Sequence, residues 1–269
     1  MLIIKASGEK VPFNRKKYEE SLRRVGLTTA EAKTISNQIY QDLYPNILSD
    51  DIFIKTHRVL KKKSRILAAK YGLKRALMNL GPAGYFFERY MARVLSAYDY
   101  RTSYNQFITG RCVEHEVDII AERAGKKYMI ECKYHNTSGL KSDIKVVLYV
   151  YARFLDLKDI HGFSEAVLIT NTGCTSEAIK YARCNNVKII AWRYPGDQDD
   201  LGHYIESKKL YPVTVLTALN QYLNVKFREN GIILAADLLK FTPRALSKKF
   251  QIKEPFAKQI INEAAVLTE

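Results

Sequence analysis

The pattern of apolar and polar residues in the first 81 residues changes from short strand-like runs to a helical period. Short apolar runs at 2–5 and 10–13 predict two strands joined by a turn. Four later stretches place apolar residues three or four positions apart, which is the period of a helix packed on one side. These helices are expected from Asn14 to Gly26, from Thr29 to before Pro45, from Ser49 onward, and from about Lys63 to Leu80. The pattern predicts a mainly helical domain over 1–81, ended by Gly81-Pro82.

Residues 82–193 alternate between strand-like and helical patterns. A helix is expected first, at 85–95, followed by three strands, a helix, a strand, a helix and a last strand. The expected ranges after the first helix are 100–107, 114–121, 128–133, 142–157, 166–170, 176–184 and 187–192. Gly125-Lys126 would turn the second strand into the third. The order αβββαβαβ predicts an α/β domain with a mixed sheet and helices on both faces.

The remainder of the chain is interpreted as a linker and a third domain. Residues 194–210 are polar, with two glycines and three aspartates, and are predicted to link two domains. Residues 211–269 have the pattern of about four short helices. The expected architecture is therefore an α/β core flanked by two mainly helical domains.

Charge is distributed unevenly over these segments. The net charge is +15, and residues 1–85 hold 17 lysines and arginines against 7 acids. Residues 86–205 hold 16 against 15, and residues 206–269 hold 10 against 6. Basic flanks favour a polyanion partner such as nucleic acid or nucleotide, although excess lysine can also serve only solubility. A nearly neutral middle leaves room for a cluster of carboxylates.

Such a cluster is expected on two neighbouring strands. Asp118 interrupts the apolar run Val117–Ile120, and Glu131 and Lys133 alternate with Ile130 and Cys132. Side chains of a strand point to opposite faces with period two, so Glu131 and Lys133 project together. The hairpin brings Asp118 beside them. The alternative is that Glu131 and Lys133 form an ordinary exposed ion pair.

Two acids buried side by side are costly unless a cation neutralises them. Mg²⁺ prefers carboxylate oxygens and keeps several waters, so Asp118 and Glu131 are expected to hold it, with the Cys132 backbone carbonyl as a further ligand. The metal would activate a water at the scissile phosphate, and Lys133 would orient that water or stabilise developing charge. Glu88, on the helix before the sheet, is expected to reach the same site as a further metal ligand. Mn²⁺ is expected to substitute.

These residues carry a resemblance to a known superfamily. Gly84 to Glu88, Val117-Asp118 and Ile130 to Tyr134 resemble the PD-(D/E)xK restriction-endonuclease-like superfamily, particularly its Mrr-type members. The resemblance covers roughly 83–192 and implies a magnesium-dependent phosphodiesterase acting on DNA, with Asp118, Glu131, Lys133 and Glu88 in the site. Val117 stands where the motif's name has proline. Tyr134-His135 replaces the glutamine that follows the lysine in some members.

Residues 1–81 resemble the ATP-cone, a nucleotide-binding regulatory domain. The resemblance rests on Ile3-x-Lys5, Gly8, Phe13-Asn14, Lys17, Ser21-Leu22 and Ser49 to Ile52. It implies that ATP or dATP binds, with Lys5 and Lys17 at the phosphates and Asn14 near the base or ribose. Ala6 and Phe53 depart from the family's pattern. A basic helical domain that grips DNA phosphates is the alternative.

The C-terminal stretch 246–265 faintly resembles a helix-hairpin-helix, a motif that grips the DNA backbone. Gln251 stands where that motif has glycine, so a structural cap or a dimerisation module is an equal alternative.

Together these patterns predict a magnesium-dependent DNA endonuclease, regulated by ATP or dATP and acting in restriction or defence. Two alternatives stay open: a non-catalytic, nucleotide-responsive DNA-binding protein, and a Holliday-junction or repair nuclease. A homo-oligomer is expected. The polar N-terminus, the lack of an 18-residue apolar run and four cysteines without CxxC spacing predict a cytoplasmic protein with reduced thiols and no membrane partner.

Overall fold

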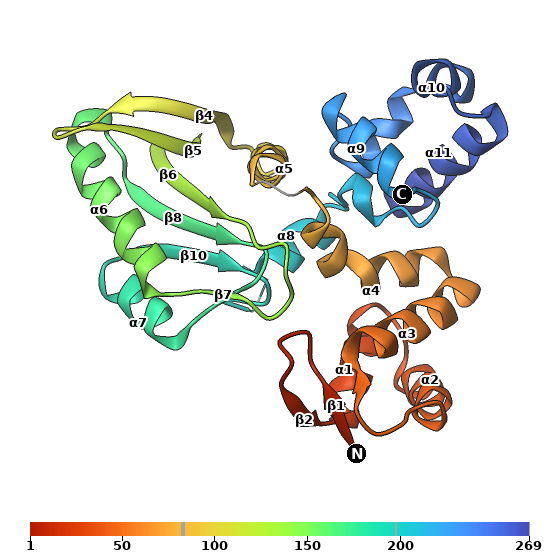
Figure 1. The fold of residues 1–269 in the computed structure, drawn as a ribbon. Helices are drawn as coiled ribbons and strands as arrows, with labels where there is room; N and C mark the ends of the chain where they lie inside the picture. Colours follow the sequence, from red (N-terminus) through yellow and green to blue (C-terminus); the bar gives the residue numbers. More distant parts are fainter. Residues whose placement is uncertain (82–83, 197, 269) are drawn as a thin grey trace.

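The computed structural model of the protein describes residues 1–81, 84–196 and 198–268. Pro82 and Ala83, where the first expected domain gives way to the second, lie outside these residues. The N-terminal part combines a small sheet with four helices (Figure 1). Its strands are β1 (Leu2–Ile4), β2 (Lys10–Pro12) and β3 (Ile47–Leu48), in the order β2-β1-β3. Its helices are α1 (Arg15–Arg24), α2 (Thr29–Gln41), α3 (Ser49–Lys63) and α4 (Arg65–Met78).

Side-chain caps explain where these helices begin. The Asn14 side chain accepts a hydrogen bond from the Lys17 backbone N–H at 2.9 Å, which fixes the start of α1 as the sequence predicted. Helix α2 is capped by Thr28, one residue before the predicted position, because Thr28 and Glu31 form a reciprocal capping box. Strand β3 was not predicted. It pairs in parallel with β1 through only two residues, too short a run to show a period.

The central part is a five-stranded mixed sheet, which confirms the predicted mixed α/β class. Helix α5 (Tyr85–Ser96) precedes β4 (Arg101–Thr109), β5 (Glu114–Arg123) and β6 (Lys126–Lys133). Helix α6 (Ile144–His161), β8 (Glu165–Thr170), α7 (Ser176–Cys184) and β10 (Lys188–Ala191) follow. The strand order is β10-β8-β6-β5-β4, with β4, β5 and β6 antiparallel and β6, β8 and β10 parallel. Two-residue strands β7 (Lys141–Ser142) and β9 (Gly173–Cys174) pair beside it.

Each face of this sheet buries its own apolar core. Helices α6 and α7 cover one face, and α5 lies on the other (Figure 1). On the α6 side, Met129 and Leu168 pack with Val147 and Val150. On the α5 side, Ile130 and Cys132 pack with Phe87. The alternation along β6 therefore places Ile130 and Cys132 on the face opposite Glu131, as predicted. That face is the one covered by α5, whereas Glu131 points toward α6.

The segment 194–210 differs from the predicted linker. It contains α8 (Leu201–Ser207), whose Leu201 and Ile205 are completely buried in the larger core. Asp200, one of the polar residues that suggested a linker, accepts a hydrogen bond from the His203 N–H and caps this helix. A seven-residue helix places only about two apolar residues on its buried side, which is too few to show a helical period in a sequence that is otherwise polar.

The C-terminal part packs on α4 as well as on the central domain. It consists of the 3₁₀ segments η1 (Val213–Val215) and η2 (Ala235–Lys240) and of α9 (Gln221–Glu229), α10 (Pro243–Phe250) and α11 (Glu254–Thr268). Leu73 and Leu77 of α4 share one core with Val213 and Ile260. Gln251, at the turn between α10 and α11, has a φ of 53°, the left-handed region that favours glycine. No described helix is long and apolar enough to cross a membrane.

Candidate active site

Asp118 lies in the middle of β5 with little access to water. Its Oδ2 accepts a hydrogen bond from the Cys132 backbone N–H of β6 at 2.7 Å, so the two strands place the carboxylate beside Glu131. Burial first, and then the charges of Glu131 and Glu88, raise the pKa of Asp118 to about 7. The hydrogen bond from Cys132 and the charge of Arg153 only partly oppose this rise. Asp118 is thus a carboxylate that would gain from a nearby cation.

Glu131 is held by an arginine that the sequence interpretation did not include. Arg153 of α6 donates from Nη1 to Glu131 Oε2 at 2.5 Å and from Nη2 to the Tyr149 hydroxyl at 2.6 Å. The Arg153 side chain is 8% exposed and that of Glu131 is 17% exposed, so this ion pair is shielded from solvent. Arg153 stands three residues after Val150 and four before Leu157, on the apolar side of α6. A charge at that spacing was the signal that could have found it.

Lys133 ends β6 and is exposed. Among residues 1–81, 84–196 and 198–268, no hydrogen bond or ion pair engages its ammonium group. The exposed Glu131–Lys133 pair, considered as an alternative, is not formed, because Glu131 pairs with Arg153. Lys133 is therefore free to meet a substrate.

Asn171 fixes the backbone that follows this lysine. The His135 N–H donates to Asn171 Oδ1 at 2.9 Å, and Asn171 Nδ2 donates to the His135 carbonyl at 2.7 Å. Asn171 directly follows β8 and is completely buried. The two hydrogen bonds hold the chain two residues beyond Lys133 against the end of the neighbouring strand.

Glu88 approaches the pair from the first turn of α5. Its pKa is raised by burial first and by the charges of Glu116 and Glu131 next. A Cβ atom built on Gly84 would lie 3.1 Å from Glu88 Oε1, so the absence of a side chain at Gly84 leaves room for this carboxylate. Glu88 therefore lies close enough to interact with the site electrostatically.

The donor atoms of the site fit a hard divalent cation, although the side chains do not form a ready cage. In the described part of the chain, no three or more His, Cys, Asp or Glu side chains are grouped to hold a metal ion. Arg153 pairs with Glu131 and is also the positive charge that acts on Asp118, so it supplies counter-charge to both neighbouring carboxylates. The Cys132 thiol lies in the α5-side core, where burial raises its pKa, so only its backbone could contribute. Two carboxylates and a carbonyl suit Mg²⁺, which keeps waters in its remaining positions.

The residues proposed to bind nucleotide lie apart from this site. Lys5 pairs with Glu9 at 2.8 Å on the exposed hairpin. The Asn14 side chain is engaged as the cap of α1, and Lys17 is exposed on the first turn of that helix. The three residues thus lie on and beside the N-terminal hairpin.

Comparison with known proteins assigns the chain to a family. The restriction endonuclease model matches residues 82–194, and the AF1548-like C-terminal model matches residues 211–268. An uncharacterized protein of Archaeoglobus fulgidus is 37% identical over 174 residues, which are 65% of this chain and 97% of that protein. The chain belongs to the AF1548-like family. The crystal structure of AF1548, a protein of unknown function, has 35% identity and a TM-score of 0.59 over 69% of this chain and 98% of its own.

The comparisons confirm the nuclease part of the sequence interpretation at the level of the family. The matched range 82–194 contains Asp118, Glu131, Lys133 and Arg153. Both matched models begin after residue 81, so the ATP-cone resemblance of the N-terminal part stays a prediction.

Proposed function

We propose that this AF1548-like protein is a magnesium-dependent endonuclease that hydrolyses phosphodiester bonds in DNA. The observation that carries the proposal is the pair of neighbouring carboxylates, Asp118 and Glu131, next to the unengaged ammonium of Lys133. The restriction endonuclease match over 82–194 supports the same reaction class. DNA is the expected substrate because the flanks of the chain are basic.

Each side chain has a task that its position permits. Asp118 and Glu131 would hold the metal together with the Cys132 carbonyl, and Mg²⁺ supplies a polarised phosphate and a more acidic bound water. Lys133 would orient the attacking water or stabilise the charge that develops on the phosphate oxygens. Glu88 would contribute through a metal-bound water or a second ion. Mn²⁺ would substitute for Mg²⁺ with the same donor set.

Arg153 bears on how the site would hold a metal. Its guanidinium pairs with Glu131 and fixes the orientation of that carboxylate. A metal that binds Glu131 has to share or displace this contact, so Arg153 would set the metal affinity as well as the stability of the site.

We also propose that an adenine nucleotide, ATP or dATP, modulates assembly or cleavage, in a homo-oligomer that serves cytoplasmic restriction or defence. This proposal starts from the ATP-cone resemblance, with Lys5, Lys17 and Asn14 as candidates. An effector acts only through a difference in affinity between two states, and a coupling of about 1–3 kcal/mol would be typical. Calorimetry and light scattering on wild type and on Lys5→Ala/Lys17→Ala test this proposal. Unchanged nucleotide binding by the variant would exclude these two lysines from the nucleotide site.

A panel of DNA substrates tests the activity and separates the two alternatives. Purified protein is incubated with unmodified plasmid, base-modified plasmid and a four-way junction, with and without Mg²⁺ and ATP. Cleavage of plasmid that requires Mg²⁺ is the expected result. Cleavage of the junction alone would favour a repair nuclease, and binding without cleavage of any substrate would favour a non-catalytic DNA-binding protein.

A further inference from the structure

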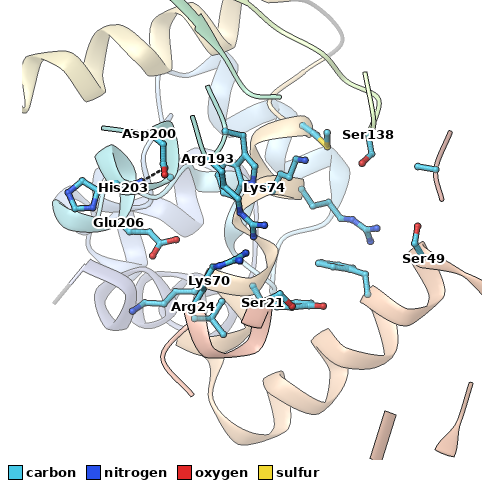
Figure 2. A pocket seen from close by; sticks show the side chains of 18 of the residues that line it. Ser21, Arg24, Ser49, Lys70, Lys74, Ser138, Arg193, Asp200, His203 and Glu206 are labelled. Atoms are coloured by element: carbon cyan, nitrogen blue, oxygen red, sulfur yellow. Dashed lines mark hydrogen bonds between the residues drawn. The ribbon is translucent and has the colours of Figure 1, made fainter. Parts of the chain in front are cut away.

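A polar cavity of about 690 Å³ lies where the N-terminal helices meet the end of β10 and helix α8 (Figure 2). It is separate from the candidate catalytic carboxylates, and neither Lys5, Asn14 nor Lys17 lines it. Its polar lining comes from α1, α3, α4, α8 and two connecting segments. Its charged residues include Arg24, Lys70, Lys74, Arg193 and Glu206.

The acidic side chains of this lining leave much of its positive charge unmatched. Five lysines and arginines face three carboxylates. Asp50 pairs with Arg75, whose guanidinium also lies 3.8 Å from the Phe53 ring centre. Asp200 is engaged in capping α8.

The cations that remain are Arg24, Lys70, Lys74 and Arg193, and one carboxylate, Glu206, lies among them. Arg24 lies 3.7 Å from Glu20, a loose contact at the surface. Within the described ranges, no hydrogen bond or ion pair engages the side-chain nitrogens of Lys70, Lys74 or Arg193. Figure 2 shows Arg24, Lys74 and Arg193 arranged around one space, with Glu206 to the side.

These basic groups repel one another in the ligand-free protein. The pKa of Lys74 is lowered by burial and by the charge of Arg193. The pKa of Arg193 is lowered by loss of solvent and by the charge of Arg24. Folding therefore brings like charges together here at a cost, and a bound anion would remove that cost.

We infer that this junction cavity binds a small ligand carrying two or more phosphate groups. Cations from α1, α4 and the segment after β10 suit several phosphate oxygens, because guanidinium groups bind them in pairs and ammonium groups act as point charges. One phosphate would leave most of these charges unmatched. Ser21 and Ser49 add hydroxyl donors. The volume falls within the range of about 300–1,000 Å³ typical of small-ligand sites, which favours a compact ligand over a passing DNA strand.

Two segments that line the cavity connect it to the edge of the sheet that carries the candidate catalytic residues. Ser138 lines the cavity and lies five residues after Lys133, in the segment that leaves β6. In the same segment, a Cβ built on Gly139 would lie 3.8 Å from Ser7 Cβ, so it touches the N-terminal hairpin turn. Arg193 lies two residues after the end of β10, on the edge where β6 also ends. A polyphosphate would hold the N-terminal helices against this edge.

Calorimetry on the full-length protein at about 0.15 M salt tests the site without any cleavage reaction, with inorganic tripolyphosphate and ATP as probes. Lys74→Gln/Arg193→Gln removes two cavity cations, and Lys16→Gln/Arg23→Gln is the matched control, because it removes an exposed lysine and an exposed arginine of α1 that do not line the cavity. Wild type and control should bind at least one probe with equal affinity. The cavity variant should bind at least tenfold more weakly. Its ligand-free Tm should be higher than that of wild type, because the repulsion is gone.

Three results would overturn the inference. They are no binding of either probe by wild type, equal affinity of the cavity variant and the control for the probes, and binding of a single-stranded oligonucleotide with none of either probe. The last would identify the cavity as part of a DNA channel. All three leave the proposed nuclease untouched, because none depends on cleavage.

Discussion

At the scale of single residues, the main feature of the site is a carboxylate, Asp118, whose acidic neighbours make its ionised form less stable. Asp118 is partly buried, lies near the charges of Glu131 and Glu88, and accepts a hydrogen bond from the Cys132 backbone N–H. Arg153 offsets only part of this repulsion. Such an arrangement weakens the metal-free protein and strengthens its affinity for a cation, which is how a binding site differs from a structural ion pair.

The first prediction concerns pH and the metal-free protein. The folded pKa of Asp118, about 7, lies above its ordinary value of 3.8, so the folded state holds the proton more tightly. The stability linked to this group is fully present below about pH 4 and is lost as the pH rises through 7. Asp118→Asn mimics the protonated form and should be more stable than wild type, on the order of 1–2 kcal/mol, above pH 7.

Thermal unfolding of both proteins in EDTA between pH 5 and 8 checks this prediction. The difference in stability should shrink as the pH falls toward 5. A difference that does not change with pH would show that Asp118 is already ionised at low pH in the folded protein.

The second prediction concerns Arg153. Arg153→Met should destabilise the metal-free protein by about 2–4 kcal/mol, because Glu131 loses the partner of a shielded ion pair. Added Mg²⁺ should stabilise the variant more than wild type, since the cation replaces the lost charge. Arg101→Met is the control: its pair with Glu122 lies on an exposed side chain, and about 0–1 kcal/mol is expected. Equal Mg²⁺ effects on wild type and Arg153→Met would contradict a cation at Glu131.

At the scale of elements, the strongest patterns were read correctly and the weakest were missed. The β5–β6 hairpin was predictable, because Gly125 separates two apolar runs. In the structure Gly125 has a φ of 76°, a conformation that favours glycine at such a turn. Helix α8 and strand β3 were missed, because seven and two residues are too few to show a period. Arg153 was missed for another reason. Its place on the apolar side of α6 could have indicated a buried charge, but no local pattern identifies its partner, Glu131, which lies 22 residues away on another element.

The third prediction concerns the tie between the β4–β5 turn and α6. Asp156 accepts hydrogen bonds from the Cys112 N–H at 3.0 Å and contacts His115 at 2.9 Å. A Cβ on Gly110 would overlap Asp156 Oδ2, so Gly110→Ala should displace this carboxylate and cost about 1–3 kcal/mol. Gly173→Ala meets its nearest atom at 4.0 Å and should be tolerated. Denaturant unfolding of both variants decides the matter, and equal stability would mean that the turn relaxes freely.

At the scale of the whole molecule, the flanking regions form part of one continuous core. Leu73 and Leu77 of α4 are buried with residues of the C-terminal helices, and the Thr214 hydroxyl donates to the Ala76 carbonyl at 2.7 Å. Deleting residues 1–81 would therefore expose apolar surface. The role of the basic flanks is therefore better tested by substituting individual lysines than by deletion.

The fourth prediction is that DNA affinity depends on lysines of the flanks. Lys61→Gln/Lys62→Gln, at the exposed end of α3, should reduce the slope of log affinity against log salt by about 1–2, since each phosphate contact contributes about 0.9. Lys145→Gln/Lys180→Gln removes two exposed charges from the central domain and should leave the slope unchanged. Fluorescence anisotropy at several salt concentrations measures both. The reverse pattern would place the phosphate contacts on the central domain.

The central claim is tested most directly by the rate of Mg²⁺-dependent cleavage of plasmid DNA by wild type, Asp118→Asn and Lys133→Ala. Both variants should lose at least 100-fold in rate while keeping their fold and nearly full DNA affinity, because each removes a group with a task only at the reacting phosphate. Glu88→Gln should be slowed less, and Lys126→Ala, at the exposed hairpin turn, should cleave like wild type. Cleavage by Asp118→Asn or Lys133→Ala at the wild-type rate would contradict the account.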